Sequence, residues 1–146
     1  ESTDDRFAFW SLAGEQIAKR PLLGTGFHTF HHAEINPLEM DTHNFFLREV
    51  VEKGVVGALI LLVMLLKILR MCWRSFRIAV PGTLFYGFTI GLLAAFLALM
   101  IGNVFGDRFT YYPMIAHFWL YVGLALRGMQ LRFAEMAEEG EYERIA

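Results

Sequence analysis

Two adjacent polar residues, His43 and Asn44, stand immediately before a segment that becomes wholly apolar. Asp41, Thr42 and Asn44 are residue types that cap helix N-termini, so a helix is predicted to begin beside His43. The positive partial charge of a helix N-terminus disfavours imidazolium, and a general base must be neutral. Because the same N-terminus attracts phosphate, the pattern fits proton abstraction next to a phosphate-linked lipid. A hydrogen-bonding cap without chemistry fits the same residues.

An arginine and a tryptophan four residues apart, Arg6 and Trp10, share one face of a predicted helix that Pro21 ends. They form either a surface cation–π pair, worth about 0.5–1 kcal/mol, or an arginine presented to an anionic ligand. Gly24 and Gly26 then allow a tight turn. We interpret this G-x-G as a turn rather than a nucleotide-binding site, because the rest of a nucleotide-binding pattern is missing. The helix, the turn and the apolar segment together indicate an interfacial or re-entrant hairpin on a bilayer.

Most of the histidines lie in the first part of the chain, at positions His28, His31, His32 and His43. A metal site is one hypothesis, because imidazole is a common metal ligand. The sequence contains no H-E-x-x-H pattern, however, and we expect neither a metal nor another cofactor. Nucleophilic serine chemistry is disfavoured because no serine stands in a G-x-S-x-G context. Cys72 is the only cysteine, which excludes a disulfide within the chain.

The composition indicates a membrane protein. The 146-residue chain is 55% hydrophobic and only 19% charged, and its mean hydropathy is +0.41, which is high for a soluble domain. A net charge of −2 and the lack of a basic stripe with interleaved aromatics exclude a nucleic-acid binder. The chain opens with Glu1 and shows no signal peptide, so we expect the carboxy-terminal part of a longer protein.

Three apolar segments predict an all-α membrane protein with about three transmembrane helices, near 44–70, 80–105 and 110–127. Residues 1–43 precede them as an outer-face, helical or re-entrant segment, and residues 44–132 hold the membrane part. Tyr111 and Tyr112 open the third segment and fit the aromatic belt of a membrane interface. Residues 133–146 are predicted to form an acidic cytoplasmic tail that frays into solvent.

The distribution of basic residues predicts the orientation of these helices. The connection after the first apolar segment contains no acid and four basic residues, Lys67, Arg70, Arg74 and Arg77. Short loops rich in lysine and arginine stay in the cytoplasm. This orientation places residues 1–43 outside and the carboxy-terminus inside, with Asp107 and Arg108 of the next connection on the same side as His43.

Three motifs carry a family resemblance: RFAFW, PLLGTGFHTF and HNFFLREVVEKGVVG, in this order and before an apolar helix. Together they resemble the O-antigen ligase and O-antigen polymerase family over about residues 6–66. Members of this family are many-helix enzymes of the bacterial inner (plasma) membrane that build lipopolysaccharide and other polysaccharides of the cell envelope. The two later apolar segments agree with the helical end of such enzymes.

The resemblance implies a glycosyltransferase that moves a glycan from undecaprenyl pyrophosphate to a saccharide or lipid A-core acceptor at the outer face. The transfer would invert the sugar configuration and need no metal. By resemblance, His43 is the base that activates the acceptor hydroxyl, Asn44 orients it, and Arg6 binds pyrophosphate. Further candidates for substrate binding are Trp10, Asp107 and Arg108.

The chain departs from the family pattern in two respects. His28 stands where the family often has a small residue, and the upstream helices and further phosphate-binding arginines are not in these 146 residues. We therefore expect these residues alone to be inactive. The alternative from another class is a non-catalytic membrane module whose histidine-rich outer loop binds a metal ion or a partner protein. Neither the acceptor nor the choice between ligase and polymerase follows from the motifs.

Overall fold

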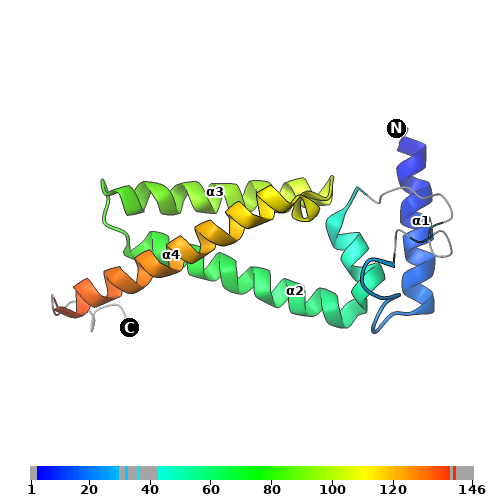
Figure 1. Ribbon diagram of the computed structural model, residues 1–146, viewed down its shortest axis with the longest axis horizontal. Helices are drawn as coiled ribbons and strands as arrows, with labels where there is room; N and C mark the ends of the chain where they lie inside the picture. The colour runs from blue at the N-terminus through cyan, green and yellow to red at the C-terminus, as the bar shows by residue number, and fades with distance from the viewer. Residues whose placement is uncertain (1–2, 30–31, 33–35, 37–42, 139, 141–146) are drawn as a thin grey trace. The chain divides into compact units, whose positions relative to one another are not determined.

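The computed structural model describes residues 3–29, 32, 36, 43–138 and 140, with side chains from Trp10 onward. All secondary structure in these residues is helical (Figure 1), which confirms the predicted all-α class for them. The elements are α1 (Thr3–Lys19), α2 (Phe45–Ile78), α3 (Leu84–Val104), the 3-10 helix η2 (Arg108–Thr110) and α4 (Tyr112–Glu138). They form two compact units, one of Glu1–Met64 with Leu99–Tyr111 and one of Leu65–Ala98 with Tyr112–Ala146.

Two helices, α2 and α3, are long and apolar enough to cross a membrane. Only 17% of the most apolar stretch of each is buried, whereas the core helix of a soluble protein would be mostly buried. Large apolar side chains project from these helices, among them Leu59, Ile60, Val63, Leu97 and Ile101. The helix α4 does not meet the same criterion, so the third transmembrane helix stays a prediction.

Two predicted boundaries are wrong. α2 runs on to Ile78 rather than ending near residue 70, so the basic stretch expected as a connection is helical. Lysine and arginine are good helix formers, and the chain leaves the helix only before Pro81 and Gly82, where the backbone cannot continue it. Likewise α4 continues to Glu138, so the first residues of the expected acidic tail are helical. The Thr83 hydroxyl then caps α3 by accepting the amide of Tyr86 at 3.2 Å.

α2 is broken at Gly54, whose φ of 65° and ψ of −172° are not helical. The break leaves unpaired amides at the start of the second segment and unpaired carbonyls at the end of the first. Residues 21–26, the loop that follows α1, lie against residues 51–56 and pair with both sides of the break. We call this pairing the clasp.

Backbone hydrogen bonds satisfy two amides and two carbonyls at the break. Four bonds of 2.9–3.2 Å run from the amides of Val55, Val56, Thr25 and Gly26 to the carbonyls of Pro21, Leu22, Val51 and Glu52, respectively. A buried backbone group without a partner would cost free energy comparable to a lost hydrogen bond. The loop after α1 is therefore fixed to α2 by the need to satisfy the interrupted helix.

Two glycines permit the close approach of these backbones. Both are in the left-handed region, with φ of 69° at Gly24 and 65° at Gly54. A Cβ atom on Gly24 would lie 2.5 Å from the carbonyl carbon of Glu52. A Cβ atom on Gly54 would lie 2.2 Å from the carbonyl oxygen of Leu22. No side chain fits at either position without moving backbone.

A small apolar core also joins α1 to the first segment of α2, residues 45–53. Ala13 and Val51 are fully buried against each other, and Ile17 and Leu47 pack around them. Figure 1 shows this short segment of α2 beside α1. Ala13 and Ile17 of α1 thus pack on protein within the first unit.

The second unit is held by aromatic contacts between neighbouring helices. The ring of Phe76 on α2 lies 5.6 Å from that of Tyr86 on α3, centroid to centroid. The rings of Phe96 on α3 and Phe118 on α4 are 6.2 Å apart. The Arg132 guanidinium of α4 donates to the carbonyl of Ile78 at 3.3 Å, which ties α4 to the end of α2.

We predict that Gly54→Ala lowers the thermal unfolding temperature, measured by circular dichroism in detergent micelles, more than Gly82→Ala does. Gly82 has a φ of 85° but open space around it, so an alanine there costs only the left-handed conformation, about 1–2 kcal/mol. Gly54→Ala adds a collision with the Leu22 carbonyl. Gly14→Ala, in α1 with no neighbour within 4 Å, is expected to be neutral or stabilising. Equal losses at positions 54 and 82 would contradict the clasp.

Candidate functional site

The structure places His43 immediately before α2, half-buried and in the left-handed region with a φ of 46°. A non-glycine residue in this region is uncommon, and such backbone conformations cluster at functional sites. Asn44 accepts the amide of Leu47 on its Oδ1 at 3.0 Å and so caps the helix. The predicted helix start beside His43 therefore lies where expected.

The helix that begins beside His43 is not, however, a continuous membrane helix. Its first segment spans residues 45–53, about 14 Å at about 1.5 Å per residue, and the apolar run starts only after Gly54. His43 thus precedes a short helical segment, and the apolar run of α2 follows that segment after Gly54. An isolated glycine inside a helical pattern was the signal that sequence reasoning did not use.

The N-terminus of this segment also has fewer amides to offer an anion than expected. The amide of Phe45 donates to the carbonyl of Gly106 at 3.0 Å, and the amide of Leu47 is taken by Asn44. A phosphate site here would therefore depend mainly on guanidinium groups. The Phe45–Gly106 bond, in turn, brings the connection between α3 and α4 next to the start of α2. The rings of Phe45 and Phe109 support this contact with centroids 5.1 Å apart.

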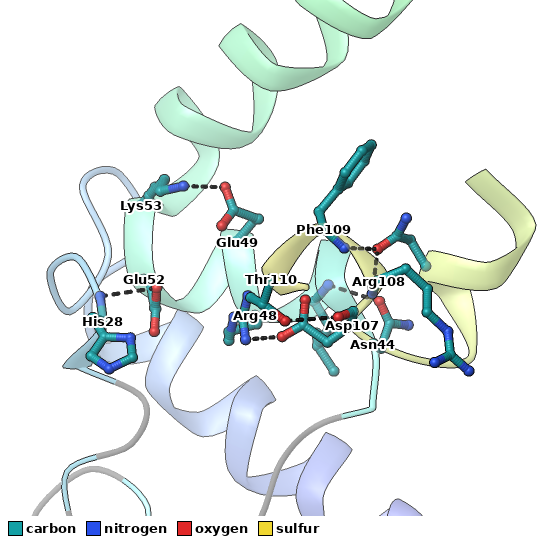
Figure 2. Close-up of polar contacts among 12 residues, drawn as sticks. His28, Asn44, Arg48, Glu49, Glu52, Lys53, Asp107, Arg108, Phe109 and Thr110 are labelled. Carbon is teal, nitrogen blue, oxygen red and sulfur yellow. Dashed lines mark hydrogen bonds and ion pairs between the residues drawn. The ribbon is translucent and has the colours of Figure 1, made fainter. Parts of the chain in front are cut away.

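One buried side chain, Asn103 at the end of α3, shapes this connection. Its Oδ1 accepts the amides of Arg108 and Phe109 at 3.1 and 3.2 Å, and its Nδ2 donates to the carbonyl of Leu99 at 2.8 Å. Figure 2 shows the two bonds donated by the amides of Arg108 and Phe109. The backbone of Arg108 is fixed in this way while its side chain stays exposed. Arg108 therefore presents a cation beside the loop that contacts the start of α2.

A buried ion pair links the first segment of α2 to the same connection. The guanidinium of Arg48 binds the carboxylate of Asp107, and the two side chains are only 7% and 8% exposed (Figure 2). The guanidinium carbon of Arg48 also lies 5.8 Å from the centroid of the Phe45 ring. Removing one member of a buried pair leaves an uncompensated charge, at a cost of about 3–5 kcal/mol. The pair thus holds the loop of Arg108 to the helix that follows His43.

Sequence reasoning missed Arg48, although it singled out Asp107. Arg48 stands four residues after Asn44 on the first segment of α2, where an arginine in an apolar context reads as a solvated side chain. Its carboxylate partner is 59 positions away, so no local spacing could reveal the pair. The Phe45–Gly106 bond and the Arg48–Asp107 pair bring the segment that carries His43 and Asn44 against the connection that carries Asp107 and Arg108.

The other two predicted residues lie on α1. Arg6 is within the helix, but its side chain is outside the described part of the chain. Trp10 is exposed. The expected Arg6–Trp10 contact therefore lies outside what the structure describes, and the role of this pair in binding stays a prediction.

A second set of charges lies beside the clasp. The backbone amide of His28, which has a φ of 58°, donates to the buried carboxylate of Glu52 at 3.1 Å. Glu49, also buried, pairs with Lys53 one turn later, and the ammonium of Lys53 lies 5.6 Å from the centroid of the Phe27 ring. His28 is thus held through its backbone by α2. Sequence reasoning noted the departure at His28 but not its acidic partner.

No group of three side chains of metal-binding type gathers among the residues that the structure describes. His31 lies outside them, so the histidine loop is described only in part. His117 is exposed on α4.

Comparisons with protein-family models, with curated proteins and with solved structures found no match to this chain.

We predict that Arg48→Met and Asp107→Leu each lower the free energy of unfolding in mixed micelles by about 3–5 kcal/mol. The double variant is expected to lose clearly less than the sum, because it leaves no unpaired charge. The control Glu135→Gln removes the exposed partner of Arg132 and should cost about 0.2–1 kcal/mol. Strict additivity of the two single losses would show that Arg48 and Asp107 do not interact.

Proposed function

We propose that this protein is a membrane glycosyltransferase of the O-antigen ligase and polymerase type. The observation that carries the proposal is the meeting of His43, in a strained backbone conformation, with the loop that presents Arg108. The contact is made by the Phe45–Gly106 hydrogen bond and reinforced by the Arg48–Asp107 pair. A candidate base and a cation carried by two segments of the chain that contact each other suit chemistry on a lipid-linked pyrophosphate.

In the proposed reaction the His43 imidazole takes the proton of the acceptor hydroxyl as its oxygen attacks the anomeric carbon of the donor sugar. The new glycosidic bond forms on the face opposite the leaving group. The bond from that carbon to the pyrophosphate oxygen breaks, and undecaprenyl pyrophosphate leaves with the electron pair. Arg108, with Arg6 from α1, meets the negative charge that develops on the leaving oxygens. No metal is needed in this scheme.

The remaining site residues act by fixing geometry. Asn44 caps the helix directly after His43, and so restrains the backbone that carries the imidazole. Asp107 is engaged by Arg48, so its proposed role is to hold the Arg108 loop rather than to touch the donor. Trp10 is exposed on α1, and its proposed role is to stack on a sugar.

The proposed setting is a bacterial inner membrane with three spans, α2, α3 and α4. The carboxy-terminal half of α2 carries four basic residues, Lys67, Arg70, Arg74 and Arg77. They favour a cytoplasmic location for that end of the helix. His43 and Arg108 then lie on the outer face, where lipid-linked glycans meet their acceptors. The donor, the saccharide or lipid A-core acceptor and the bilayer are the proposed partners.

We predict that His43→Asn in the complete protein lowers the rate of glycan transfer by about 10²–10⁴-fold, the usual contribution of a general base. Asparagine tolerates the left-handed conformation, so this variant removes the imidazole without adding the strain of alanine. The matched control is His117→Asn on α4, which should keep the parental rate. The measurement is transfer from an undecaprenyl-pyrophosphate-linked glycan donor in membranes that hold the protein.

Full activity of His43→Asn would refute the assignment of the base. So would labelling of a His43→Cys variant by a membrane-impermeant maleimide from the cytoplasmic side only. The metal-binding alternative has its own signature, which is stoichiometric zinc in the purified protein that is lost when His28, His31 and His32 are replaced together. That result, with activity unaffected at position 43, would favour the alternative.

A further inference from the structure

Three large apolar side chains of the loop after α1 project from the protein. Leu22 is 66% exposed, Leu23 76% and Phe27 81%. Fully burying one such side chain is worth about 1.5–3 kcal/mol, so leaving three of them in water forgoes a large stabilisation. Adjacent exposed apolar side chains of this kind mark a surface that contacts something other than water.

The clasp fixes the position of these leucines along α2. The carbonyl of Leu22 accepts a hydrogen bond from the amide of Val56 at 3.2 Å. The apolar tip of the loop, Leu22 and Leu23, therefore lies beside the first turn after the helix break. Val55 and Val56 are themselves exposed, and exposed Leu59 and Ile60 follow one turn later. The apolar tip therefore lies next to the point where the apolar surface of the candidate membrane helix begins.

Basic side chains lie near the tip, and phospholipid phosphates attract positive charge. Lys19 and Arg20, directly before the loop, are exposed. Lys53 lies over the ring of Phe27. The acids of this region, Glu49 and Glu52, are buried and bound to Lys53 and to the amide of His28. An apolar tip below a basic rim matches a membrane surface, with acyl chains under phosphates.

We propose that Leu22 and Leu23 insert into the acyl region of the outer leaflet, with Lys19 and Arg20 at the headgroup phosphates. The occupant of this surface is the phospholipid bilayer. The inference rests on the membrane placement in the proposed function, but not on the chemistry of His43. In this proposal the clasp fixes the depth of the first unit relative to the bilayer.

Backbone chemistry limits how deep the tip goes. Irregular backbone exposed to lipid is costly, because the hydrocarbon offers no hydrogen-bond partners. Pro21 has no amide, and the amides of Gly24, Thr25 and Gly26 are bonded to carbonyls of the protein. The backbone on both sides of the two leucines is therefore largely satisfied. A depth of about 5–10 Å, that of interfacial segments at the headgroup–acyl boundary, suits this loop.

The test is spin-label accessibility in the complete protein, reconstituted into vesicles of phosphatidylethanolamine and phosphatidylglycerol. Labels are placed at Leu23→Cys, at Leu59→Cys as the lipid reference and at Glu15→Cys as the water reference, in a cysteine-free background that includes Cys72→Ala. We expect the ratio of oxygen to nickel-chelate accessibility at position 23 to be several-fold higher than at position 15. It should approach, without exceeding, the ratio at position 59.

Each other outcome overturns the inference in a distinct way. A ratio at position 23 equal to that at position 15, with position 59 in lipid, leaves the tip in water while the membrane placement stands. Low accessibility to both reagents at position 23 shows a protein contact instead. A water-like ratio at position 59 removes the membrane placement and the inference together. Leu22→Cys repeats the test, and the exposure of both leucines means that neither change disturbs packing.

Discussion

An interrupted helix must have its exposed amides and carbonyls satisfied, and this requirement organises the first unit. The clasp meets it by laying the loop after α1 across the break at Gly54, so one set of four backbone bonds fixes both the loop and the direction of the chain after the break. The short segment before the break then packs on α1 through Val51 and Ala13. Its other end carries Asn44, the cap beside His43.

A second constraint, the desolvation of charge, fixes the connection between α3 and α4. The Arg48 and Asp107 side chains are buried as an ion pair. Asn103 orders the turn from α3 into η2 by accepting the amides of Arg108 and Phe109. The Phe45–Gly106 hydrogen bond adds a third contact between this connection and the start of α2. Together they restrict the backbone on both sides of the candidate site, which is the preorganisation that the proposed transfer reaction would need.

Composition and periodicity were enough to predict the helical class, the α3 segment near 80–105 and the helix start beside Asn44. These are local properties, since apolar length and capping residues act over one or two turns. The break at Gly54 was missed because the isolated glycine does not by itself reveal the loop, some thirty positions earlier, that pairs with the interrupted helix, and Arg48 was missed because its partner is 59 positions later. Long-range pairing of backbone and of charge leaves no periodic trace in a single sequence.

Four main-chain hydrogen bonds hold the clasp, with one further bond from the Thr25 hydroxyl to the Val51 carbonyl, and this has a consequence for how the chain can change over evolutionary time. Side chains at Leu22, Thr25 or Val56 could be exchanged for others of suitable polarity without removing the main-chain bonds. Gly24 and Gly54 have no such freedom, because a Cβ atom on either glycine would collide with the backbone of the segment paired with it. As sequences diverge, the residues around the clasp should therefore change before Gly24 and Gly54 do, so that this pair of distant glycines would be the feature by which the clasp is recognised.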